Sequence, residues 1–441
     1  MADSHSSVAL ADTASGNARW LQLIIGAVGM IAIANLQYGW TLFVGPITDK
    51  FHWSEVDIQV AFSIFVLLET WLAPFEGHLV DRFGPRLIVL IGSIFVGISW
   101  IINSVASSLS LLYLGAAIGG IGMGTVYSTC VGNALKWFPD RRGLAAGITA
   151  AAFGAGSALT LIPIRHVIKT YGYQSAFLWF GIAQGLVVLL CALLIRAPVL
   201  GDEPAEEKAT VQQSTRDFHW REMLSTPAFW LLYVMFIAVA TGGLMATAQL
   251  GPIARDFKVS GESVSLLGIT MAALPFALAL DRILNGISRP LFGWLSDSLG
   301  RENTMFLVFG LEGCTILLLV TFAHSPVLFV VLSGVAFFAW GEIFSLFPAL
   351  SGDLFGRKFA TTNYGLLYTA KGIAALLVPV GSLLEVATGS WKPIFGLAVA
   401  LDWTAALLAF FVLKPLCARW LSAQRSAASP ATGDMEPAAQ G

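Results

Sequence analysis

The chain has 441 residues, of which 56% are hydrophobic and only 12% are charged, and its mean hydropathy is +0.75. Soluble domains carry roughly 25% charged residues, so this composition excludes a water-soluble protein and indicates a membrane protein. The net charge of −2 argues against a nucleic-acid partner. The four cysteines are scattered and form no CxxC pair, so we expect neither a metal site, nor a cofactor, nor a disulfide framework.

Residues 1–19 are mostly polar and lack the basic region of a signal peptide, so we expect a cytoplasmic N-terminal segment followed by a retained helix. Crossing a bilayer takes about 20 mostly apolar residues. Twelve such runs follow, which predicts an all-α membrane protein. Their centres lie near Ala32, Val66, Phe95, Gly122, Ala152, Val187, Ala238, Leu278, Leu311, Ala336, Ala374 and Leu401.

A polar, charged stretch at 198–225 divides these spans into two six-helix halves, residues 20–197 and 226–415. The tail, 416–441, is predicted to be cytoplasmic and, from Ser422 onward, disordered. With twelve spans both termini lie on one side of the membrane. That side carries 16 Lys and Arg, which predicts a cytoplasmic location for the termini and the middle loop. The opposite side has six: Lys50, Arg165, Lys169, Arg255, Lys258 and Lys392.

The two halves repeat each other. The loop GHLVDRFGPR (77–86) and the loop GWLSDSLGRE (293–302) are 216 residues apart, and a second register at 217 sets Tyr127 against Phe344. Such glycines let helix ends approach closely, while the aspartate can cap a helix and pair with an arginine. We therefore predict a conformational latch formed by Gly77, Asp81, Arg82, Gly293, Asp297 and Arg301. This repeated loop resembles the signature of the major facilitator superfamily, a fold of two pseudo-symmetric six-helix halves.

Three cations remain inside predicted spans: Arg282, Arg289 and Lys371. Each costs roughly 2.5–3.5 kcal/mol at a helix centre, so intramembrane cations are functional by default. The repeat sets Arg289 against Ala73, so the scaffold itself does not require an arginine there. Arg282 lies nearer the helix centre, and it is also explained as the structural partner of a buried acid, either Asp281 or Glu342.

Aromatic side chains recur at helical spacing near these cations. Trp340 and Phe344 share a face, as do Tyr364, Tyr368 and Lys371. Such rings are usually packing residues, but together they can shape a dry pocket that strengthens cation–carboxylate attraction. Glu342 lies between two of the rings, and we consider it, with Asp281 and Arg282, for substrate binding or coupling. Glu69, Glu76 and Glu312 also fall within spans.

Three stretches, 119–147, 285–305 and 337–372, resemble the bacterial oxalate:formate antiporter family through the motifs WFPDRRG, NGxxRP and NYGxxxxAKG. The resemblance implies that Arg289 and Lys371 bind substrate carboxylates. It also implies an aromatic cage and a pocket glutamine, at Tyr38, Tyr127, Phe153, Trp340, Phe344, Tyr368 and Gln59. Phe153, Phe344 and Tyr368 stand where the family's oxalate carrier has Tyr, Tyr and Trp, and that carrier has no charge equivalent to Asp281, Arg282 or Glu342.

These observations predict a monomeric carrier of small carboxylates (oxalate, formate or similar) in the bacterial inner membrane, working by antiport. Proton-coupled symport is the main alternative, because Asp281 and Glu342 offset part of the positive charge. A membrane sensor is a remote alternative, since no signalling domain is appended. An enzyme is not expected, because the scattered Ser and His residues form no nucleophile constellation.

Overall fold

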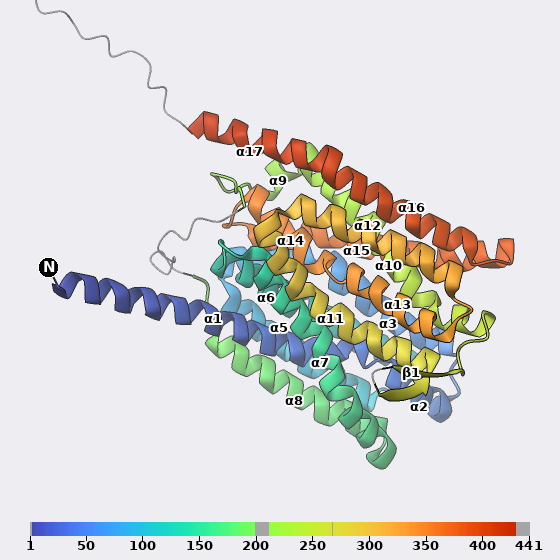
Figure 1. Cartoon of the computed structure of the whole chain (residues 1–441). Coiled ribbons are helices and arrows are strands. Elements are labelled where there is room, and N and C mark those ends of the chain that lie inside the picture. Colours follow the sequence, from blue (N-terminus) through green and yellow to red (C-terminus); the bar gives the residue numbers. More distant parts are fainter. Residues whose placement is uncertain (1, 199–210, 267, 429–441) are drawn as a thin grey trace, which may run out of the picture.

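The computed structural model describes residues 2–198, 211–266 and 268–428. Its long helices run side by side, with α1 and α8 along the lower edge of Figure 1 and α16 and α17 along the upper edge. The first half consists of α1 (Ala2–Tyr38), α2 (Thr41–Phe51), α3 (Glu55–Trp71), α4 (Ala73–Phe83), α5 (Pro85–Val105), α6 (Leu109–Trp137), α7 (Arg142–Tyr171) and α8 (Tyr173–Leu194).

The second half follows the short linker helix α9 (Trp220–Leu224). It consists of α10 (Pro227–Asp256), the strands β1 (Ser263–Leu266) and β2 (Ile269–Ala272), α11 (Ala273–Leu299), α12 (Arg301–Phe322), α13 (Pro326–Trp340), α14 (Ile343–Phe355), α15 (Ala360–Thr388), α16 (Lys392–Leu408), the π-helical turn η1 (Ala409–Leu413) and α17 (Lys414–Ala428). The strands form an antiparallel hairpin in register Ser263 with Ala272, which the sequence pattern did not predict.

Nine helices of the described residues are long and apolar enough to cross a membrane, or ten when the bent pair α3–α4 is one span. The bend of 45° falls at Leu72, where Pro74 has no N–H to continue the hydrogen-bond ladder. Two further long helices, α11 and α15, carry the intramembrane cations and complete the twelve-span plan. In α11, Asp281, Arg282 and Arg289 lower the mean hydropathy, which explains why apolarity alone misses this helix.

Both ends of the chain differ from expectation. Helix α1 already begins at Ala2 rather than near Arg19. The tail predicted to be disordered from Ser422 is helical as far as Ala428, because α17 continues α16 through η1. Residues 429–441, and 199–210 of the predicted middle loop, lie outside the described residues.

The two halves meet at helix crossings where glycine is required. Helix α4 crosses α15 at Gly77, whose Cβ would lie 2.5 Å from the carbonyl oxygen of Thr361. Helix α11 crosses α7 at Gly293, whose Cβ would lie 2.1 Å from the carbonyl oxygen of Gly143. The repeat relates these crossings, so each half contributes one glycine-lined approach to the other. We call this end of the bundle, where α1 of the described chain begins, the terminal end.

We predict that Gly293→Ala destabilises the protein, because the added methyl group has no room between α7 and α11. Overpacking of this kind costs about 1–3 kcal/mol. Thermal unfolding in detergent measures it. The matched control is Gly286→Ala on the same helix, where nothing lies within 4 Å of the added Cβ. Equal melting temperatures for the two variants would contradict the tight crossing.

Candidate functional site

Arg289 lies buried on α11 at the boundary between the halves, with 3% of its surface exposed. One guanidinium nitrogen donates to the carbonyl oxygen of Ala150 on α7 at 2.7 Å, and another donates to Oδ1 of Asn285 at 2.8 Å. Its Nε has no hydrogen-bond partner among the described residues. Both acceptors that the guanidinium has among the described residues are thus neutral, so no carboxylate of this part of the chain is hydrogen-bonded to its positive charge.

Lys371 on α15 has a different environment. Its Nζ donates to the hydroxyl of Tyr368 at 2.8 Å and lies 3.3 Å from Oε1 of Glu69. The Tyr368 hydroxyl donates to the same Glu69 oxygen at 3.0 Å. Because Glu69 comes from α3, this triangle joins the two halves, and Lys371 already has a carboxylate partner.

One ring lies against both cations. The Arg289 Cζ is 4.8 Å, and the Lys371 Nζ 5.8 Å, from the centroid of Phe344. An aromatic face attracts a cation electrostatically, so Phe344 stabilises both charges. The positive groups of α11 and α15 therefore lie against the same aromatic ring.

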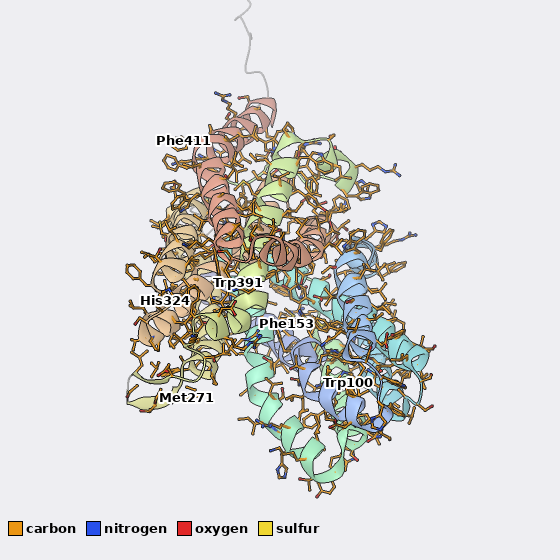
Figure 2. The ribbon with its side chains drawn as sticks, turned by 90° about the vertical axis from the view of Figure 1, so that its right-hand side faces the viewer. Trp100, Phe153, Met271, His324, Trp391 and Phe411 are labelled. Carbon is orange, nitrogen blue, oxygen red and sulfur yellow. The ribbon has the colours of Figure 1, made fainter. Side chains whose placement is uncertain are left out.

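The N-terminal half supplies the opposite wall of rings. Tyr127 of α6 stacks on Tyr368 at a centroid distance of 5.1 Å and meets Phe153 edge-on at 5.4 Å. Phe153 in turn contacts Tyr38 of α1 at 5.2 Å. Figure 2 looks along the bundle and places Phe153 between Trp100 of the first half and Trp391 of the second.

Arg282 and Asp281 occupy positions outside this centre. Arg282 is exposed, seven residues from Arg289 towards the start of α11, which corresponds to about 10.5 Å. Its guanidinium lies 5.3 Å from the centroid of Tyr38. Asp281 is 3% exposed, and neither carboxylate oxygen has a hydrogen-bond partner among the described residues. The structure therefore places Arg289, rather than Arg282, at the centre.

Three other predicted residues make no hydrogen bond or ion pair with either cation within the described part of the chain. Gln59 is exposed near the start of α3, so the structure does not bring it into the pocket. Trp340 packs edge-on to Phe344 at 5.9 Å and lies against Gly243 of α10. Glu342 is fully buried at the α13–α14 break. Neither of its carboxylate oxygens has a hydrogen-bond partner among the described residues.

Sequence reasoning noted Glu69 as an intramembrane acid but did not assign it to the site. The internal repeat contains the missing signal, since the offset of 216 that sets Arg289 against Ala73 also sets Glu69 against Asn285. At 217, Lys371 corresponds to Gly154, whose Cβ would lie 3.9 Å from the Arg289 Cζ. Equivalent positions of the two halves therefore converge on one site with different side chains.

The predicted latch residues lie at the terminal end. Asp297 accepts hydrogen bonds from the N–H groups of Gly143 and Leu144, at 3.0 and 2.9 Å, and so caps α7 of the other half. Asp81 does the same for α15, where it accepts from the N–H and the hydroxyl of Thr362 at 2.8 and 2.6 Å. Each half thus caps a helix of the other.

Buried ion pairs reinforce these caps. Asp353 accepts from Arg142 at 2.7 Å and from Arg301 at 2.8 Å, and Arg301 also pairs with Asp297 at 2.6 Å. In the N-terminal half, Lys136 rather than Arg82 pairs with the loop aspartate, at 2.5 Å from Asp81. Arg82 is exposed and lies over the ring of Phe83, outside this network, because the helix turns its side chain away from α15.

Comparison with known proteins identifies the family to which the chain belongs. The family model described as Major Facilitator Superfamily matches residues 23–285 and 240–435. The oxalate:formate antiporter of Oxalobacter formigenes is 34% identical over 397 residues, which cover 90% of this chain and 91% of the relative. The chain belongs to the major facilitator superfamily and, within it, to the oxalate:formate antiporter family.

More distant relatives include the uncharacterised transporter YhjX of Escherichia coli, 29% identical over 81% of this chain and 86% of its own, and monocarboxylate transporter 12-B of Danio rerio, 25% identical over 77% and 75%. The proton:xylose symporter XylE shares the fold with a TM-score of 0.70 at 14% identity, covering 92% of this chain and all of its own. The protein is therefore a multi-pass membrane transporter of this superfamily and not an enzyme.

We predict that Tyr368→Phe destabilises the folded protein, because the hydroxyl accepts from Lys371 and donates to Glu69. Leaving buried charged partners without this bridge costs about 1–3 kcal/mol. Thermal unfolding in detergent measures the loss. The control is Tyr173→Phe, whose hydroxyl is buried without a hydrogen-bond partner among the described residues. Equal effects of the two variants would contradict a structural role for the Tyr368 hydroxyl.

Proposed function

We propose that this protein moves small carboxylate anions across the bacterial inner membrane by alternating access, as an oxalate:formate-type antiporter. One observation carries the proposal: the Arg289 guanidinium is buried between the two halves, and in the described ranges its hydrogen-bond acceptors are all neutral. A buried charge without an ionic partner is costly. An anionic substrate is the natural counterion for it.

In this proposal Arg289 and Lys371 bind the substrate from two helices of the C-terminal half. The rings of Tyr38, Tyr127, Phe153, Phe344 and Tyr368 enclose it and keep the site dry. Low local polarity strengthens the attraction between the cations and a carboxylate. Specificity for a small substrate follows from the short distances between the rings and the two cations.

Alternating access also needs a gate. The two cross-half caps, by Asp297 on α7 and by Asp81 on α15, hold the terminal end together. We propose that this end faces the cytoplasm and that the caps release when the carrier opens inward. One chain carries the whole site, so the carrier acts as a monomer.

Exchange follows from the charge of the pocket. When substrate is absent, a pocket with an unpaired cation resists enclosure in an apolar interior, so the loaded carrier reorients more readily than the empty one. Proton-coupled symport is the second candidate function. The Glu69–Lys371 contact favours it, because an internal counterion lowers the cost of returning empty.

We predict that reconstituted protein takes up labelled oxalate or formate against unlabelled carboxylate inside the vesicles. Arg289→Ala and Lys371→Ala should each reduce this counterflow about tenfold or more, because loss of one partner of a buried charge pair typically costs 2–5 kcal/mol. The matched control is Lys392→Ala, which removes a cation outside the pocket. Uptake that is indifferent to internal carboxylate would contradict antiport, and unaffected counterflow in both alanine variants would contradict the site.

A further inference from the structure

One of the two cations, Lys371, already forms an ion pair with a carboxylate of the protein itself. Glu69 is fully buried, and its Oε1 accepts hydrogen bonds from the Tyr368 hydroxyl and from the Lys371 ammonium group. Its second oxygen, Oε2, is also buried and has no hydrogen-bond partner among the described residues. Glu69 thus holds Lys371 in the way that one end of a substrate would hold it.

The second cation has no such partner. Arg289 bonds to a backbone carbonyl and to an amide oxygen, both neutral, within the described part of the chain. With Glu69 ionised, the two cations and one carboxylate give a net charge of +1. That charge matches one carboxylate of a substrate, whereas two carboxylates would leave an excess negative charge in an apolar pocket.

The count of +1 covers Arg289, Lys371 and Glu69, and the neighbouring acid Glu76 bonds to neither cation within the described residues. From α15 Glu69 faces Lys371, Tyr368 and Tyr364, and from α6 it faces Tyr127. From α4, the buried Glu76 interacts with it electrostatically and accepts the Thr125 hydroxyl at 3.2 Å. The hydrogen bonds of Glu76 include neither cation, so Glu69 is the acid placed to exchange with a substrate carboxylate.

We propose that Glu69 is an internal carboxylate ligand that sets the charge of the transported substrate, an inference that rests on the proposed function. A monocarboxylate binds at Arg289 while Glu69 stays ionised on Lys371. A dicarboxylate reaches Lys371 only by displacing Glu69, and Glu69 then takes up one proton from water.

The proton balance is simple. Two carboxylates that compete for one ammonium group repel each other, and protonating one of them removes the repulsion. The displaced Glu69 gains an O–H bond, and its carboxylic acid remains in the site as a neutral donor. The loaded site then holds two cations and two substrate charges, so it is neutral and free to reorient. Dicarboxylate binding is thereby coupled to one proton and monocarboxylate binding to none.

Equilibrium binding of labelled oxalate and labelled formate to purified wild-type protein, from about pH 6 to about pH 8, tests this. Both ligands are fully ionised there, since carboxylic acids titrate near or below pH 4. Uptake of one proton predicts that the oxalate Kd rises about tenfold per pH unit as pH increases. The formate Kd should stay constant. A wild-type oxalate Kd that does not change with pH overturns the proposal without any variant.

Glu69→Gln should abolish the pH dependence for oxalate and shift the preference from formate towards oxalate, because the pocket then has a charge of +2. The matched control, Glu76→Gln, removes a neighbouring buried acid and should keep the wild-type slope. Persistence of the slope in Glu69→Gln, or its equal loss in Glu76→Gln, overturns the role of Glu69 but leaves carboxylate binding intact. Binding of neither ligand to wild-type protein overturns the proposed function as well.

Discussion

The burial of a guanidinium and an ammonium group between two apolar half-bundles is the constraint on which the rest of this structure depends. Both cations are largely buried, with 3% of Arg289 and 8% of Lys371 exposed, so each needs local compensation. Arg289 donates to the carbonyl oxygen of Ala150 and to the amide oxygen of Asn285, and it lies over the ring of Phe344. Lys371 donates to the Tyr368 hydroxyl and to Glu69. Because Ala150 and Glu69 belong to the N-terminal half, satisfying the charges also holds the halves together.

The internal repeat explains how one scaffold builds an asymmetric site. The backbone crossings at Gly77 and Gly293 are equivalent, and so are the helix caps made by Asp81 and Asp297. The repeat therefore preserves the close contacts that keep the terminal end closed. The side chains near the centre differ between the halves, since Arg289 corresponds to Ala73 and Lys371 to Gly154. That divergence places both cations in one half and their acceptors partly in the other.

The terminal end and the centre are joined by the same helices. Helix α11 carries both Arg289 and Asp297, and helix α15 begins at the segment capped by Asp81 and continues to Lys371. A rigid helix that moves at one end also moves at the other. A change in the charge around Arg289 and Lys371 can therefore shift α11 and α15, the two helices that take part in the caps. This linkage is the physical basis for the alternating access proposed here.

The amino-acid sequence determined the membrane class and the two-half plan and singled out Arg289 and Lys371 as candidate ligands, because apolar length, internal repetition and charges within apolar runs can be read without the fold. The tertiary structure decided which partners those charges have. The pairing of Glu69 with Lys371 joins residues 302 positions apart. Asp81 forms its ion pair with Lys136 and not with its sequence neighbour Arg82, which depends on the face of α4 that packs on α15. Hydropathy and spacing contain no information on such pairings, since they arise only when helices of the two halves are brought together.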